Sequence, residues 1–200
     1  MKRWIAAILC LSLLLAMFAG CASEEAGLES GVSTSAPASQ DASEAQPIDL
    51  GEILTVDIDG KEVTQEIFAG HKLTVVNVWA TWCTWCLKEM PHLAEIAEEM
   101  EADGVQIVGL VTDAGTAGAV DEEQLALVKE IMEQTGVEYP IILPDASLSE
   151  ILLSQVAGLP QTFFVNGEGE ALPLYYPGYQ DKEGWISTIQ SVLATLEGES

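Results

Sequence analysis

The residues best suited to chemistry in this chain are two cysteines three positions apart, Cys83 and Cys86. Thiols at this spacing can close and reopen a disulfide, which is a reversible two-electron reaction. The surrounding pattern places Cys83 where a buried strand gives way to a helix. Unpaired backbone N–H groups and the helix dipole favour a thiolate at that point. We therefore expect Cys83 to be the nucleophile in thiol–disulfide exchange, and Cys86, one helical turn further on, to be the resolving thiol.

Other uses of two cysteines at this spacing are less well supported. A structural zinc ion needs two more ligands, and His71 and His92 do not form a second paired spacing. Covalent haem attachment needs a histidine directly after the second cysteine, where this chain has Leu87. A permanently closed structural disulfide remains an alternative, although so short a loop would restrict the unfolded chain little. We therefore expect neither a metal ion nor another cofactor.

The elements that must position these thiols alternate between strands and helices. Residues 73–79 form a β-branched run typical of a buried strand. Apolar residues then recur at helical spacing to residue 100, with Pro91 expected to bend this helix or to mark a broken first turn. Further strands are expected at 105–111 and 139–143, further helices at 122–134, 148–156 and 182–196, and hairpins around Asp59-Gly60 and Asn166-Gly167. The predicted fold class is α/β, a mixed central β-sheet flanked by helices with an N-terminal β-hairpin.

The N-terminal segment has the features of an export signal. Lys2 and Arg3 precede an uncharged run that ends in Phe18-Ala19-Gly20-Cys21. This resembles a bacterial lipoprotein signal, in which residues 1–20 are removed and Cys21 is lipidated. An ordinary signal peptide and an uncleaved anchor remain alternatives. Residues 21–47, rich in Ser, Ala and acidic side chains, read as a flexible linker to a domain at 48–200. The expected location is extracytoplasmic, lipid-anchored to the bacterial cell membrane, where thiols can be oxidised.

The charge balance excludes some partners. Lys and Arg total 7 against 32 Asp and Glu, for a net charge of −25. A sequence-independent nucleic-acid binder needs a cationic surface to displace counterions from phosphates, so no nucleic-acid partner is expected. The same balance argues against electrostatic docking on anionic lipid.

Two sequence blocks resemble a known family. Val76-Asn77-Val78-Trp79-Ala80-Thr81-Trp82-Cys83-Thr84-Trp85-Cys86, with Lys88-Glu89-Met90-Pro91 after it, resembles the active-site segment of TlpA/ResA-like thioredoxin-fold oxidoreductases. Gly158-Leu159-Pro160-Gln161-Thr162-Phe163-Phe164-Val165, followed by Gly167-Glu168-Gly169, resembles their cis-proline loop and the next hairpin. The resemblance spans about residues 50–197 and implies a thioredoxin fold for the domain.

The resemblance also implies roles for single residues. Pro160 would be the cis proline that faces the thiols, and Leu159 before it would contact the substrate. Glu89 matches an acidic residue near the thiols, which would exchange a proton with the resolving thiol and, when ionised, disfavour its thiolate. A solvated helix glutamate is the alternative for Glu89. Trp82 and Trp85 are expected to form an apolar rim for substrate docking.

The implied activity is that of a membrane-tethered thiol–disulfide oxidoreductase that reduces disulfides of exported proteins. Candidate clients are an apocytochrome c and an exported methionine sulfoxide reductase, and a membrane electron carrier of the CcdA/DsbD type would restore the dithiol. Thr84-Trp85 stands where many members have prolines, so a disulfide-forming oxidant remains an alternative. A non-enzymatic binding or assembly lipoprotein is a further alternative. A peroxidase is disfavoured, because Thr81 is only two residues before Cys83 and no proline precedes it.

Overall fold

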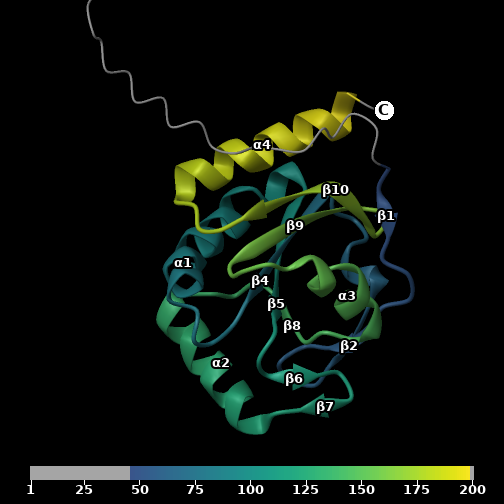
Figure 1. Ribbon diagram of the computed structural model, residues 1–200. Helices are drawn as coiled ribbons and strands as arrows, with labels where there is room; N and C mark the ends of the chain where they lie inside the picture. The colour runs from purple at the N-terminus through teal and green to yellow at the C-terminus, as the bar shows by residue number, and fades with distance from the viewer. Residues whose placement is uncertain (1–45, 199–200) are drawn as a thin grey trace, which may run out of the picture. The chain divides into compact units, whose positions relative to one another are not determined.

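A mixed sheet forms the centre of the domain in the computed structural model, which describes residues 46–198 (Figure 1). The predictions for Cys21, the signal and most of the linker lie outside these residues. In spatial order the strands are β1 (Ile48–Asp49), β10 (Glu170–Pro177), β9 (Gln161–Asn166), β4 (Leu73–Trp79), β5 (Val105–Val111) and β8 (Ile141–Ile142). The pairs β4–β5 and β5–β8 are parallel, and β4–β9, β9–β10 and β1–β10 are antiparallel. The expected mixed sheet is confirmed.

The middle strand β4 is buried along its whole length, as its β-branched run predicts. Val75 and Trp79 belong to the core cluster on one face of the sheet. Val76 and Val78 belong to the cluster on the other face. This alternation is that of a strand covered on both sides, and it makes β4 a rigid support for the segment that follows it.

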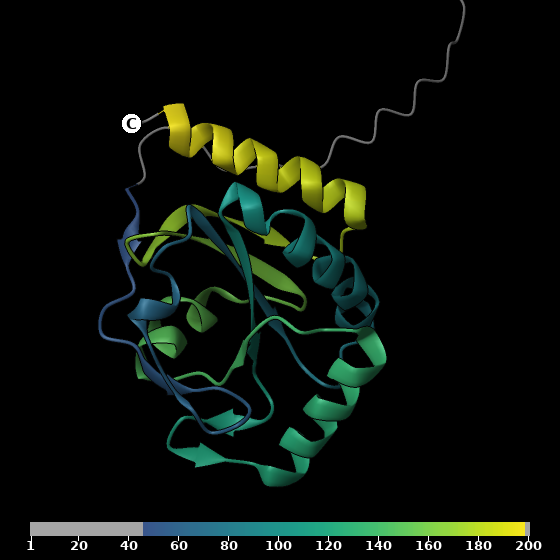
Figure 2. The ribbon, with the colours of Figure 1, turned by 180° about the vertical axis from the view of Figure 1, so that it is seen from behind.

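Helices cover both faces of the sheet. On the face of Val75 and Trp79 lie α1 (Thr84–Glu99), α2 (Glu122–Thr135) and α4 (Lys182–Gly198) (Figures 1 and 2). On the opposite face lie α3 (Ala146–Ile151) and the 3-10 turns η1 (Gln65–Ile67) and η3 (Leu153–Gln155), while η2 (Glu101–Asp103) follows α1. The helix α1 runs without interruption through Pro91, so a broken first turn is wrong. None of the helices between residues 46 and 198 is long and apolar enough to cross a bilayer.

Smaller elements depart from the sequence prediction. The strands β6 (Gly115–Thr116) and β7 (Ala119–Val120) form a hairpin that the sequence analysis did not predict. The strand expected at 139–143 is only the two-residue β8, and the helix expected at 148–156 divides into α3 and η3. Such short elements depend on the tertiary contacts around them more than on local periodicity, which explains the differences.

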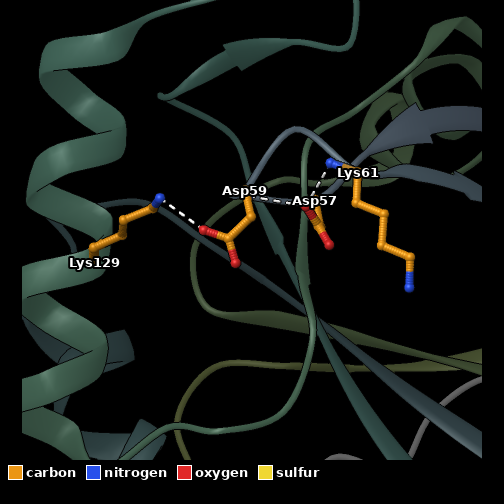
Figure 3. Close-up of polar contacts among 4 residues, drawn as sticks. All are labelled: Asp57, Asp59, Lys61 and Lys129. Atoms are coloured by element: carbon orange, nitrogen blue, oxygen red, sulfur yellow. Dashed lines mark hydrogen bonds and ion pairs between the residues drawn. The ribbon is translucent and has the colours of Figure 1, made fainter.

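The N-terminal hairpin pairs β2 (Leu54–Val56) with β3 (Glu62–Thr64), as expected, but its loop is longer than two residues. The N–H of Asp57 donates to the carbonyl of Lys61 at 2.9 Å, which leaves a three-residue loop with Gly60 at φ +78°. The Asp57 carboxylate accepts the N–H groups of Asp59 and Lys61, both at 2.9 Å (Figure 3). Lys129 of α2 binds Asp59 at 2.7 Å and so fastens the loop to the helix (Figure 3).

Candidate active site

The two cysteines form a disulfide at the start of α1, with their Cα atoms 5.3 Å apart. Cys83 is the N-cap residue, and its Sγ accepts the backbone N–H of Cys86 at 3.2 Å. Cys83 retains 5% of its surface exposed, whereas Cys86 has none. The position of Cys83 at the helix N-terminus is therefore confirmed, and it is the more accessible of the two sulfur-bearing residues.

Strand pairing brings the proline loop to the same end of the sheet. Gln161 pairs with Val78, so Pro160 lies beside the carboxyl end of β4, where the segment leading to Cys83 begins. The Leu159–Pro160 peptide bond is cis, as expected. Leu159 is half-buried and packs against the cluster that contains both cysteines.

The carboxyl group of Glu89 is enclosed in the core of the domain. Glu89 is fully buried, which excludes the solvated-glutamate alternative. It lies one helical turn beyond Cys86 and thus on the same face of α1. Its Oε1 accepts the side-chain N–H of Asn77 at 2.8 Å, and its Oε2 accepts the backbone N–H of Gln180 at 2.9 Å. Asn77 donates a second bond to Thr162 of β9 at 3.0 Å, so β4 and the segment before α4 hold the carboxyl group directly, and β9 fixes the position of Asn77.

Burial changes the acidity of this group. The pKa of Glu89 is raised from 4.5 to about 7, because burial penalises the charged form, while the Gln180 and Asn77 bonds lower it and only partly offset the effect. Burial, and to a lesser extent the charge of Glu89, raises the pKa of Tyr139 as well. Glu89 can therefore gain and lose a proton near neutral pH inside the core, where other carboxyl groups would already be ionised.

Two tryptophans next to the cysteines in the sequence are exposed to solvent. Trp82 and Trp85 expose 72% and 55% of their surface, as a docking rim would require, whereas Trp79 is buried. The Trp85 ring lies 5.5 Å from the ring of Tyr179, and the ammonium of Lys88 lies 4.3 Å from its centre. Trp85 therefore contacts two neighbouring side chains, whereas Trp82 has no such ring contact with the described residues.

Comparison with known proteins agrees with this geometry. The family model Redoxin matches residues 32–173. The chain belongs to the Redoxin family. The chain is 29% identical to the thiol:disulfide interchange protein DsbE of Haemophilus influenzae over 72% of this chain and 71% of that protein. It is 26% identical to the thiol-disulfide oxidoreductase ResA of Halalkalibacterium halodurans, over 63% and 65% respectively. The chain is a TlpA/ResA-like thiol–disulfide oxidoreductase, as the two sequence blocks indicated.

Solved structures share the fold. A thiol:disulfide interchange protein of the thioredoxin family from Chlorobium tepidum has a TM-score of 0.60 and 23% identity, with 75% of this chain and 99% of that chain covered. StoA from Bacillus subtilis has a TM-score of 0.52 and 21% identity, with 70% and 96% covered. These likenesses confirm the predicted thioredoxin fold.

Several contacts of this Redoxin site were not predicted from the sequence. The turn before the disulfide is held by Asp113, which accepts the backbone N–H of Thr81 at 3.0 Å and its hydroxyl at 2.6 Å. Tyr179 and Gln180, which reach Trp85 and Glu89, lie about a hundred residues further along the chain. The sequence offered one hint of this arrangement, a glycine directly before Tyr179 that could form a turn. In the structure Gly178 adopts φ +90°. In the described part of the chain, no group of three or more His, Cys, Asp or Glu could hold a metal ion.

Proposed function

We propose that this oxidoreductase reduces disulfides of exported proteins and that a lipid at Cys21 tethers it to the membrane. The observation that supports the reducing direction best is the buried Glu89, one turn beyond Cys86. A carboxylate enclosed in the core repels a nearby thiolate, so it destabilises the reduced, ionised form of the pair relative to the disulfide. A pair that prefers the disulfide gives its electrons to other disulfides.

The exchange has two steps. The Cys83 thiolate attacks one sulfur of a client disulfide, forms a mixed disulfide and releases the first client thiolate. Cys86 then loses its proton and attacks the Cys83 sulfur, which releases the second client thiolate and closes the Cys83–Cys86 disulfide. Two electrons pass from the enzyme's dithiol to the client. A second dithiol, on a membrane carrier of the CcdA/DsbD type, returns the enzyme to its reduced form.

Glu89 is suited to the second step. Cys86 is fully buried, so its proton has no direct path to water. The carboxylate of Glu89, with a pKa of about 7, can accept that proton at neutral pH and release it when the enzyme is reduced again. Asn77 of β4 cannot carry a proton itself, but its amide N–H holds the carboxylate in place.

The client would dock at the aromatic rim and the proline loop. Trp82 and Trp85 offer exposed apolar surface next to the cysteines in the chain, and Leu159 and Pro160 lie beside the carboxyl end of β4, which leads to Cys83. Since indole rings bury a large area at little entropic cost, they are effective anchors for an extended client segment. Clients of this kind include an apocytochrome c and an exported methionine sulfoxide reductase.

The test is reduction of insulin by the full-length protein with a thiol reductant present. We expect Cys83→Ser to abolish turnover, and Cys86→Ser to accumulate a mixed disulfide through Cys83. Normal insulin reduction by Cys83→Ser would refute the assignment of the nucleophile. For the tether, we expect labelled palmitate to appear in the wild-type protein and not in Cys21→Ser. Equal labelling of both proteins would contradict lipidation at Cys21.

A further inference from the structure

The segment between β10 and α4 touches three parts of the active site. The N–H of Gly178 donates to the carbonyl of Pro160, the cis proline, at 2.8 Å. The ring of Tyr179 packs against Trp85, which stands between the two cysteines, at 5.5 Å. The N–H of Gln180 donates to Glu89 at 2.9 Å. Two backbone hydrogen bonds, one on either side of Tyr179, thus fix the position from which its ring reaches Trp85.

Trp85 lies in the first turn of α1. This turn also supplies a backbone hydrogen bond to the sulfur of Cys83. The backbone N–H of Cys86, the residue after Trp85, donates to the Cys83 sulfur at 3.2 Å. In the reduced protein the same N–H stabilises a Cys83 thiolate. Trp85 is more than half exposed, so its packing against the body of the domain comes from the few groups around its ring, among which are Tyr179 and Lys88.

We propose that Tyr179 is a positioning residue for the dithiol: by holding Trp85 it keeps the first turn of α1, and with it the Cys86 N–H, aligned on the Cys83 sulfur. It acts through Trp85 and does not touch the reacting sulfurs. The proposal rests on Cys83 being the attacking thiol, as in the proposed function. Loss of the ring leaves the first turn less ordered, which weakens the hydrogen bond to the thiolate and shifts the thiol–disulfide equilibrium toward the disulfide.

The test measures the equilibrium of the Cys83/Cys86 pair with reduced and oxidised glutathione in the full-length protein. For Tyr179→Ala we expect a shift toward the disulfide of about threefold, equal to about 14 mV at the two-electron conversion of 29.6 mV per tenfold. Tyr179→Phe keeps the ring and should restore the wild-type equilibrium. The matched control is Tyr175→Ala, because Tyr175 is another tyrosine close by, on the strand β10 that precedes this segment; it is 43% exposed and packs on Phe163 at 5.9 Å. We expect the control to leave the equilibrium unchanged.

The proposal is overturned if Tyr179→Ala and Tyr175→Ala give the same equilibrium, or if Tyr179→Phe behaves like Tyr179→Ala. Thermal unfolding of each variant shows whether the domain remains folded. Should Tyr179→Ala fail to fold, Tyr179→Leu keeps apolar bulk without an aromatic face, and we expect a smaller shift in the same direction. No shift for a folded Tyr179→Leu would then overturn the proposal. An oxidising potential for the wild type would refute the reducing direction, while a Tyr179→Ala shift would still support the positioning role.

Discussion

Replacing Glu89 with glutamine tests the buried carboxyl group through protein stability. In the folded protein the pKa of Glu89 is about 7, against an ordinary 4.5, because burial disfavours its charge. Between these two values the folded chain binds a proton that the unfolded chain has released. Wild-type stability therefore falls, through this group, as pH rises from about 4.5 to about 7. Glutamine has no charge to gain, so the variant lacks this fall.

The size of the effect follows from the difference in pKa. At about 1.36 kcal/mol per pH unit, the shift from 4.5 to about 7 corresponds to about 3 kcal/mol of unfolding free energy over the whole range. Most of this change, about 2–3 kcal/mol, occurs between about pH 5 and about pH 8. At the lower pH the variant should be the less stable protein. Both oxygens of Glu89 accept N–H groups, and the NH2 of a glutamine would face the N–H donor of Asn77 or of Gln180 without an acceptor between them.

The assay is urea unfolding of oxidised wild type and Glu89→Gln at both pH values. The quantity of interest is the difference between the two proteins, because the contributions of all other carboxyl groups cancel in it. We expect this difference to move by about 2–3 kcal/mol in favour of the variant as pH rises. Glu98→Gln is the matched control, since Glu98 is an exposed glutamate on the same helix. If the unfolding free energies of wild type and Glu89→Gln differ by the same amount at the two pH values, the claim that Glu89 is a buried carboxyl group with a pKa near neutral is refuted.

Two further predictions concern packing and docking. Gly109→Ala should lower the unfolding free energy by about 1–3 kcal/mol, because its Cβ would collide with Ile141 and lie 3.1 Å from the indole nitrogen of Trp79. Gly118→Ala meets nothing within 4 Å and serves as the control, and equal urea midpoints for the two variants would contradict this packing. Trp82→Ala, which removes a side chain that is 72% exposed, should raise KM for a protein disulfide about tenfold and leave stability unchanged. An unchanged KM for insulin would show that clients do not dock on Trp82.

The sequence predicted those parts of the site that depend on local pattern. The buried strand β4, the cysteines at the start of α1 and the proline loop each lie within a short segment whose composition is specific. The environment of Glu89 could not be predicted in this way. One of its partners is the backbone N–H of Gln180, which is 91 residues away, and every residue other than proline carries such a group. The packing of Tyr179 on Trp85 likewise depends on where β10 ends and α4 begins.

The local sequence pattern also failed to predict short elements that are stabilised by particular hydrogen bonds. The turn of the N-terminal hairpin was expected at Asp59-Gly60, but the Asp57 carboxylate binds two N–H groups of the loop and lengthens it to three residues. The edge strand β1 has only two residues and exists because β10 pairs with it. In both cases the deciding interaction is a hydrogen bond whose partner the sequence pattern does not identify.

The reduction potential of the Cys83/Cys86 pair tests the central claim most directly. A carboxylate enclosed beside the resolving thiol stabilises the disulfide over the ionised dithiol, so the account predicts a potential near or below about −250 mV, in the range of thioredoxin-like reductants. The measurement is equilibration of the full-length protein with defined thiol–disulfide mixtures at neutral pH. A value near about −120 mV, that of a strong disulfide-forming oxidant, would contradict the reducing direction.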